Sequence, residues 1–395
     1  MSTATVPLGH LVEITGGGTP SRDRQDYWGG DIPWASVKDL VGPELNTTKE
    51  TISPEGLANS ASRLIAPGEV VIATRMGLGK AAINTVPIAI NQDLKALRCR
   101  PNLAPRFLLH FLLSKASVLE AMGKGATVKG IKIDQLVRLA VPLPSLAEQR
   151  RIAAILDKAD AIRRKRQQAI QLTDDLLRSA FLEIAGPGNR HYSRWPIRSI
   201  EQLAAKHDGA IRTGPFGSDL RHSEFVESGI AVLGIDNAVN NRFEWGELRF
   251  ITAEKFRVLE RYRVYPGDVI VTIMGTTGRS AVVPDDIPAA ISTKHLATIT
   301  PDLSLVQPQF LSNAIHRHPA ILRQIHGADR GAIMPGLNLT LLKALKVPLP
   351  PPEQQATFSS IVASTRTLQS KLETDLGATS DLFAALVQRA FQGEL

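Results

Sequence analysis

The chain has 395 residues, a formal net charge of +8 and one cysteine, Cys99. A single cysteine excludes an intramolecular disulfide and a cysteine-based zinc site. The sequence opens without a basic head and apolar run, and its apolar stretches are too short to span a bilayer. We therefore expect a soluble, cytoplasmic protein of two or three domains.

Residues 1–144 have the pattern of a mixed α/β domain. A β-rich run, Glu69–Thr74, follows a Pro-Gly turn, and a helical pattern comes later at Pro105–Ala121. Residues 145–186 are predicted to form one long helix, because Ser145–Glu183 contains neither glycine nor proline. Its apolar positions recur at 4-3 spacing, which indicates a narrow seam for a partner helix. The seam positions are Ile155, Ala159, Ile162, Ala169, Leu176 and Ala180.

Residues 187–350 repeat this organisation, with a second mixed domain before a second long helix at 351–395. A β-rich run at Asp268–Ile273 again follows Pro-Gly, and a helical pattern covers Pro308–Ile325. The last helix is predicted to start after three consecutive prolines, since proline suits a helix N-terminus. Its seam positions are Phe358, Ile361, Leu368, Leu372, Leu382 and Leu386.

An internal repeat relates the two halves. VPLPSLAEQ at Val141–Gln149 returns as VPLPPPEQ at Val347–Gln354, and PGEVVIATRMG at Pro67–Gly77 returns as PGDVIVTIMG at Pro266–Gly275. The expected fold is two α/β (α+β) domains in pseudo-two-fold repeat, separated by two long antiparallel coiled-coil helices. The alternative is that each helix packs only on its own domain.

The positive charge is shared equally by the two predicted domains. Residues 1–144 carry 16 basic and 12 acidic side chains, and residues 185–352 carry 19 and 15. Such an excess is typical of proteins that neutralise phosphates, although it also occurs without nucleic acid. The four consecutive cations of Arg163–Arg166 are either a solvated helix face or a contact to phosphate or a partner.

Motifs for chemistry are missing from the sequence. Gly79-Lys80 is followed by Ala81, so it is not a Walker phosphate loop. The chain has no Asn-Pro-Pro-aromatic tetrapeptide of an amino-methyltransferase. His316, His318 and His326 are poor metal ligands, because Pro319 interrupts their helix and no acidic ligand has suitable spacing. We expect no catalysis and no metal in this chain.

The sequence resembles the specificity subunits of type I restriction-modification systems. The resemblance covers essentially the whole chain. The segments that carry it are Pro7–Ser21 (PLGHLVEITGGGTPS), Ile32–Leu40 (IPWASVKDL), PGEVVIATRMG, and the twice-occurring Pro-Leu-Pro junction into a long helix, at Leu139–Asp160 and Leu345–Val362. The second half departs from this pattern, having Arg212–Ser218 and Val232–Asn237 in place of the first two segments.

The resemblance implies a DNA-binding subunit without activity of its own. Two target-recognition domains would each bind one half of a bipartite, asymmetric site in double-stranded DNA. The helices would set the spacing and dock two methyltransferase (modification) subunits, and two motor-nuclease (restriction) subunits would join for cleavage. S-adenosylmethionine, ATP and Mg would be bound by those partners, with no cofactor in this chain.

Exposed basic loops are the candidates for DNA contacts, because arginine and lysine bind base edges and phosphates. The candidates in the first domain are Arg22, Arg24, Lys38, Arg75, Lys80, Lys124 and Lys129. The candidates in the second domain are Arg212, Arg279, Lys294 and Arg330.

Apolar helix residues outside the predicted seams have two interpretations. They either dock the methyltransferase subunits or pack on the recognition domains. They are Leu156, Leu177, Phe383 and Val387. Two other functions compete with the specificity subunit, namely a stand-alone DNA enzyme, for which no catalytic domain remains, and a coiled-coil adaptor that binds two proteins and no DNA.

Overall fold

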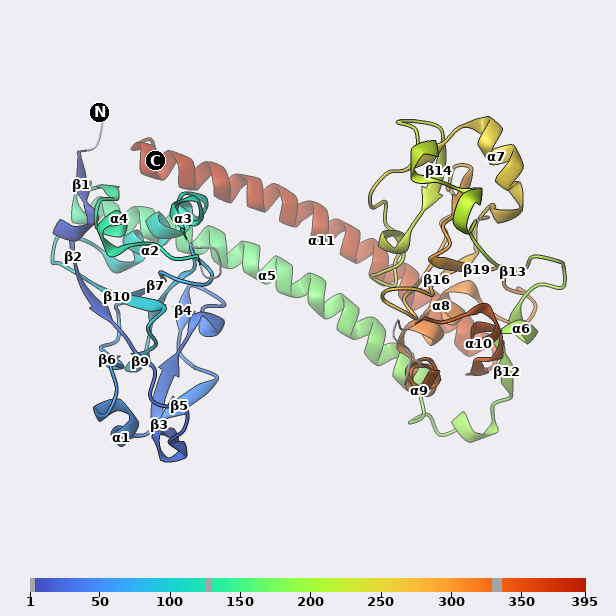
Figure 1. Cartoon of the computed structure of the whole chain (residues 1–395), viewed down its shortest axis with the longest axis horizontal. Helices are drawn as coiled ribbons and strands as arrows, with labels where there is room; N and C mark the ends of the chain where they lie inside the picture. Colours follow the sequence, from blue (N-terminus) through green and yellow to red (C-terminus); the bar gives the residue numbers. More distant parts are fainter. Residues whose placement is uncertain (1–3, 125–128, 329–335) are drawn as a thin grey trace. The chain divides into compact units, whose positions relative to one another are not determined.

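The computed structural model describes residues 4–124, 129–328 and 336–395. The chain forms two compact units. The first unit comprises Met1–Gln167 with Thr374–Leu395, and the second comprises Gln168–Glu373. Both units are mixed α/β structures, as predicted (Figure 1).

The first unit is built on a five-stranded sheet in the order β2-β10-β7-β8-β4. A four-stranded sheet in the order β5-β3-β9-β6 and the pair β1-β11 complete it. The strands are β1 (Thr5–Pro7), β2 (Val12–Gly16), β3 (Trp28–Ala35), β4 (Glu44–Leu45), β5 (Glu50–Ile52), β6 (Arg63–Ile65), β7 (Val70–Ala73), β8 (Ala81–Asn84), β9 (Ile88–Ile90), β10 (Leu94–Cys99) and β11 (Ala140–Pro142). The short helices are α1 (Pro54–Ala58), α2 (Pro105–Ser114), α3 (Ala116–Met122) and α4 (Ile133–Val137).

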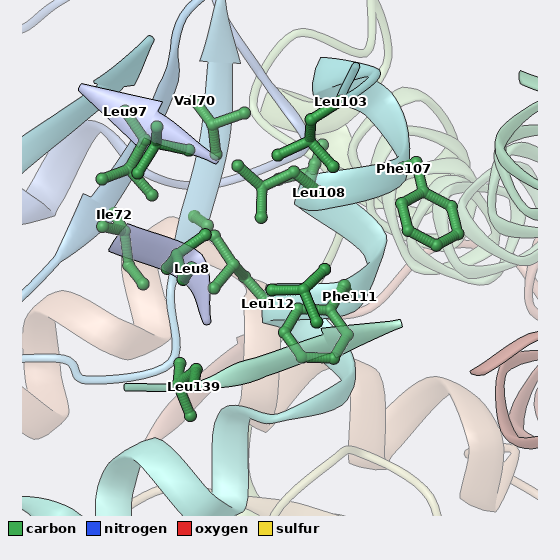
Figure 2. Packing of buried hydrophobic residues seen from close by; sticks show 14 of the residues in the cluster. Leu8, Val70, Ile72, Leu97, Leu103, Phe107, Leu108, Phe111, Leu112 and Leu139 are labelled. Atoms are coloured by element: carbon green, nitrogen blue, oxygen red, sulfur yellow. The ribbon is translucent and has the colours of Figure 1, made fainter. Parts of the chain in front are cut away.

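The main core of the first unit lies between the five-stranded sheet and α2. In Figure 2, Leu108 and Leu112 of α2 point toward Val70, Ile72 and Leu97 of the strands, and all five are fully buried. The long helix α5 (Leu146–Ala185) adds further apolar side chains to the same cluster. Burial of this extent is the main favourable contribution to folding.

The second unit repeats the architecture with fewer strands. Its sheets have the orders β13-β19-β16-β17, β15-β14-β18 and β12-β20. The strands are β12 (Ile197–Ser199), β13 (Ile211–Thr213), β14 (Ile230–Leu233), β15 (Phe250–Ile251), β16 (Val269–Thr272), β17 (Ser280–Val282), β18 (Ala290–Ser292), β19 (Leu296–Ile299) and β20 (Lys346–Pro348). The helices are α6 (Ile200–Leu203), α7 (Ala253–Leu259), α8 (Pro308–Arg317), α9 (Pro319–Ala328) and α10 (Leu339–Ala344).

Each of the two helical patterns predicted within the domains, Pro105–Ala121 and Pro308–Ile325, forms two consecutive helices in the structure. The first is interrupted at Lys115, between α2 and α3. The second is interrupted at His318, since Pro319 cannot continue α8 and instead begins α9.

The strand orders show that the second half does contain counterparts of the two segments it seemed to lack. β14 pairs in parallel with β18 as β3 pairs with β9, and β13 borders β19 as β2 borders β10. Gly17 and Gly214 occupy matching positions, where a Cβ would lie 2.0 Å from the carbonyl oxygen of Ile90 or Ser292. The fold of these segments is therefore kept while their side chains differ.

The two predicted long helices are present as α5 and α11 (Pro352–Gln392), and α11 continues through Gly377 (Figure 1). Within the first unit they run antiparallel, since Arg151 donates to the carbonyl oxygen of Leu395 at 2.6 Å and Arg166 to that of Asp375 at 2.6 Å. Within the second unit Phe181 packs on Phe358, with ring centroids 5.2 Å apart, and Asp174 lies 3.4 Å from Arg366, which together give the same antiparallel direction.

The predicted seam is wrong by one residue at several positions of each helix, although Phe358 is fully buried as predicted. Leu176 and Leu368 are 52% and 50% exposed, whereas Leu177 is fully buried and Gln369 is 5% exposed. The 4-3 spacing is retained, but its register follows the domain cores, because those cores offer more apolar surface than a facing helix does. Both helices thus pack on each other and on the domains.

The repeated junction before each long helix contains a buried glutamine with the same three hydrogen bonds. Gln149 accepts from the amide of Ala104 at 2.8 Å and donates to the carbonyl oxygens of Asn102 and Pro144. Gln355 accepts from the amide of Gln307 at 2.9 Å and donates to the carbonyl oxygens of Leu305 and Pro350. The counterpart of Gln149 is therefore Gln355, one residue beyond the end of the sequence match.

Within the described residues, the long helices are too polar to be membrane spans, and the other helices are too short.

Candidate nucleic-acid interface

The turn between β7 and β8 presents an exposed, basic edge of the first unit. Gly77 and Gly79 have φ of 98° and 85°, which glycine adopts without steric cost, and they hold the turn open. Arg75 and Lys80 flank these glycines with exposed side chains. The amide of Met76 bonds to the carbonyl oxygen of Lys129 at 3.3 Å, so a second loop lies against the turn.

That second loop carries two more of the predicted contacts. Lys124 and Gly130 exchange two backbone hydrogen bonds of 3.1 Å, which close the loop at its base, and Gly130 also bridges to Arg75. Lys124 and Lys129 are both exposed. Residues 125–128 of the loop lie outside the described part of the chain.

Lys38 comes to the same turn from a third segment, the 3-10 turn Val37–Asp39. A Cβ on Gly77 would lie 2.8 Å from Cγ1 of Val37, so the segments touch. The buried carboxylate of Asp39 accepts from the amides of Ser36 and Lys49 and fixes the segment. The structure therefore gathers five predicted contacts around one turn, namely Lys38, Arg75, Lys80, Lys124 and Lys129.

Arg22 and Arg24 are both bound to carboxylates. Arg22 forms a bidentate pair with Glu50 and stacks on Trp28, 3.6 Å from the ring centroid. Its hydrogen bonds hold the pKa of Glu50 below the ordinary value. Arg24 pairs with Asp26 at 2.6 Å. Arg75 of the turn also has a carboxylate nearby, Asp93 at 3.6 Å.

The second unit presents the corresponding turn between β16 and β17. Gly275 and Gly278 have φ of 75° and 76°, and Arg279 is exposed beside them. Lys294 is exposed on the turn between β18 and β19, which bonds to the strand leading into the glycine turn through the amide of Ile273 and the carbonyl oxygen of His295. Arg330 lies outside the described residues.

Arg212 is not placed to contact DNA, contrary to the prediction. Its side chain is 10% exposed and lies 2.6 Å from Oδ2 of Asp268. It also donates to the carbonyl oxygens of Arg263 and Gly209 and to Oγ1 of Thr300. A guanidinium with all these partners is a structural clamp, and its strand position, one residue before a glycine turn, gave no signal of burial.

The four apolar helix residues pack on the domains, which is the second of their two interpretations. Leu156 and Leu177 are fully buried in the cores of the first and second units. Phe383 and Val387 are partly buried against the first core, where they line a cavity of about 460 Å³. Leu156 and Leu177 therefore offer no surface to a partner.

The basic run of α5 is used mostly within the first unit. Arg163 and Arg164 both bind Asp160, at 2.7 and 2.8 Å. Arg166 bonds to Asp375 and Thr379 of α11, whereas Lys165 is exposed. The run is thus neither a purely solvated face nor a free cationic patch.

The histidines considered as metal ligands have other roles. His318 is 1% exposed and stacks on Tyr192, and burial lowers its pKa. Burial, reinforced by Arg317 and two other arginines, lowers the pKa of His316 to about 3. Within the described residues no group of three or more histidine, cysteine or acidic side chains is arranged to hold a metal. Of the arginines around His316 only Arg279 was predicted as a contact, and the others were missed because they come from separate segments.

Comparison with known proteins gives consistent matches. Residues 3–172 match the family model of the type I restriction modification DNA specificity domain. The EcoR124I/EcoR124II specificity subunit of Escherichia coli is 34% identical over 162 residues, which are 39% of this chain and 40% of that relative. The chain thus matches less than half the length of this relative. The EcoBI specificity subunit of Escherichia coli is 23% identical over 92% of this chain and 80% of its own length.

The fold is shared with solved structures. The S subunit of a type I restriction-modification system from M. genitalium superposes with a TM-score of 0.61 at 16% identity, over 99% of this chain and 96% of that chain. A second structure, described as the assembly and conformational transition of the type I R-M system, gives a TM-score of 0.56 at 18% identity, over 100% and 98% of the two chains.

Proposed function

We propose that the chain is a specificity subunit of a type I restriction-modification system and selects the DNA sequence on which a modification or restriction complex acts, since residues 3–172 match the family model of the type I restriction modification DNA specificity domain. One observation carries this proposal. Around the same turn of each unit the chain exposes cations, and among the described residues Lys38, Lys80, Lys124, Lys129 and Lys294 have no carboxylate within ion-pair distance.

In this proposal the turns contact the duplex in two ways. Lysines around them neutralise phosphates and fix the register of the protein on the DNA, which releases bound counterions. Neighbouring polar side chains then distinguish base edges in the groove. Because matching segments of the two units carry different residues, each unit selects a different half of an asymmetric, bipartite site.

The long helices are proposed to set the distance between the half-sites and to dock two modification subunits, joined by two restriction subunits for cleavage. The chain then performs no chemistry itself, and S-adenosylmethionine, ATP and Mg are bound by those subunits in the cytoplasm. Adding a heptad pair to both helices is expected to lengthen the spacer and leave the recognised bases unchanged. A change in the bases would contradict the helices' role as a spacer.

The deciding experiment is a genome-wide map of methylated bases in the host with and without the gene. Loss of one bipartite methylated motif on deletion is the expected result and identifies both half-sites at once. If the map is unchanged, the purified chain with its modification subunits is tested on duplex DNA. Absence of salt-dependent binding to the duplex would favour the adaptor that binds proteins alone.

The lysine loop provides a residue-level test of the same proposal. Replacing Lys124 and Lys129 by glutamine is expected to make the slope of log K (the DNA association constant) against log salt concentration less steep by about 2, since each phosphate contact contributes about 0.9. The matched control is Lys115→Gln together with Lys132→Gln, which removes the same charge from nearby positions outside the turn. An unchanged slope in the loop variant would remove the loop from the interface.

A further inference from the structure

A group of arginines from four segments of the second unit surrounds the end of α8. Arg317 ends α8 and Arg279 follows the β16–β17 turn, while Arg178 lies on α5 and Arg366 on α11. Burial and the neighbouring cations Arg366, Arg178 and Arg279 lower the pKa of Arg317, with Asp174 acting in the opposite direction. The geometry agrees, because Arg317 and Arg366 both contact Asp174 of α5 at 3.4 Å, Arg178 follows Asp174 by one turn on the same face of α5, and Arg279 contacts His316 next to Arg317.

Most of these guanidiniums have no carboxylate partner. Arg366 lies 3.4 Å from Oδ1 of Asp174. Among the described residues Arg317 donates to Oδ1 of Asn241, at 3.1 Å, and to the backbone oxygen of Asp174, at 3.4 Å. Across the described residues, no carboxylate oxygen lies within 4.0 Å of Arg178, Arg279 or Arg317.

The remaining neighbours do not cancel this charge. His316 is neutral at physiological pH, and its Nε2 lies 3.3 Å from Nη1 of Arg279. Next to Arg366, Arg242 binds both Glu244 and Glu373. Five arginines against Asp174, Glu244 and Glu373 leave the group at a net charge of +2. Like charges held this close cost free energy unless an anion binds.

The first unit shows that the fold does not require these arginines. At the matching positions it has Lys80 for Arg279, Leu113 for His316 and Ser114 for Arg317. Instead of a packed arginine group, this place in the first unit is a cavity of about 460 Å³, lined by all three. The arginines are therefore an addition to the second unit and not a condition of its folding.

We propose that Arg178, Arg279 and Arg317 form a phosphate-binding site for the backbone of duplex DNA beside the second recognition surface. This inference rests on the proposed function. Guanidinium groups bind phosphate through paired hydrogen bonds, and an excess of more than one positive charge suits successive phosphates of a strand better than a single carboxylate. Such contacts position the duplex and do not distinguish bases.

The test measures binding of a random-sequence duplex by the full chain, assembled with its modification subunits, over a series of salt concentrations. Arg178→Gln combined with Arg279→Gln changes the two exposed members and leaves half-buried Arg317 in place. The slope of log K against log salt is expected to fall by about 2. The matched controls are Lys371→Gln, on the exposed side of α11, and Arg257→Gln, on α7, for which no change in slope is expected.

Each outcome decides a different statement. If the unmodified chain binds without salt dependence, the proposed function itself fails and this site with it. If the unmodified chain shows the dependence and the double variant keeps the full slope, only the arginine site is overturned. A full slope together with weaker assembly with the modification subunits would also overturn it and assign the arginines to an acidic protein surface.

Discussion

Asp268 in the second unit and Glu69 in the first follow equivalent Pro-Gly turns, yet their cations differ. Asp268 is bound by Arg212, whose side chain is 10% exposed, together with Thr300 and the amide of Tyr265. Glu69 is bound by Arg98, whose side chain is 60% exposed, and its Oε2 has no hydrogen-bond partner among the described residues. A duplicated fold thus keeps the acidic residue while the cation moves from the surface to the interior.

This difference predicts the largest effect on stability. Arg212→Ala leaves a buried carboxylate without its cation and is expected to cost about 3–5 kcal/mol of unfolding free energy. Arg98→Ala also removes the cation of a buried carboxylate, but water can replace a side chain that is 60% exposed, so a smaller loss than for Arg212→Ala is expected. Hydrogen exchange of the β16–β19 and β7–β10 amides reports each unit separately. Equal losses in the two variants would contradict the assignment of Arg212 as a clamp.

Gln149 and Gln355, in contrast, are buried and make the same three hydrogen bonds in the two units. Gln149→Ala and Gln355→Ala each leave a buried backbone amide unpaired and are each expected to cost about 1–3 kcal/mol. The control is Arg150→Ala, which alters the exposed residue next to Gln149 on α5. Thermal unfolding of the full chain measures all three. A loss in one unit only would show that the two junctions are not equivalent.

The smallest predicted effect distinguishes the units by pH. His316 has a pKa of about 3 in the folded chain against an ordinary value of 6.5. Between these two pH values the unfolded chain therefore carries a proton on His316 and the folded chain does not. Stability of the second unit is therefore complete above pH 6.5 and is expected to fall by roughly 1–2 kcal/mol between pH 7 and pH 5.

His316→Leu installs the residue that α2 has at the matching position and should reduce this acid sensitivity. His318, with its own lowered pKa, accounts for part of what remains. The first unit has no counterpart of His316, and its exchange rates provide the internal control over the same pH range. An unaltered pH profile in the variant would show that His316 is protonated in the folded chain.

The sequence was sufficient for the architecture, because repeats and helix signals are local. The long helices were predicted within a few residues, since capping residues and runs without glycine or proline act over one turn. Their buried face was not, because Leu176 and Leu177 are equally apolar and only the position of the core decides which is buried. The sequence pattern thus predicts the spacing of the buried residues along a helix, but not which face of the helix is buried.

The basic candidates divide for a similar reason. Lysines in glycine-rich turns were predicted as exposed, and they are, since such turns have little apolar surface to bury. Arg212 differs from them in lying on a strand and in its buried partner Asp268, which is 56 residues away in the chain. A partner that distant leaves no trace in the local pattern, and the same holds for the arginines around His316.

The two junction glutamines, Gln149 and Gln355, hold the domains to the long helices through main-chain atoms. Every hydrogen bond they make goes to the main chain, at Asn102, Ala104 and Pro144 in one unit and at Leu305, Gln307 and Pro350 in the other. Side-chain substitutions at these main-chain partners therefore leave the bonds in place as long as the backbone keeps its path. The attachment of each mixed domain to its long helix is thus independent of the side chains that surround it.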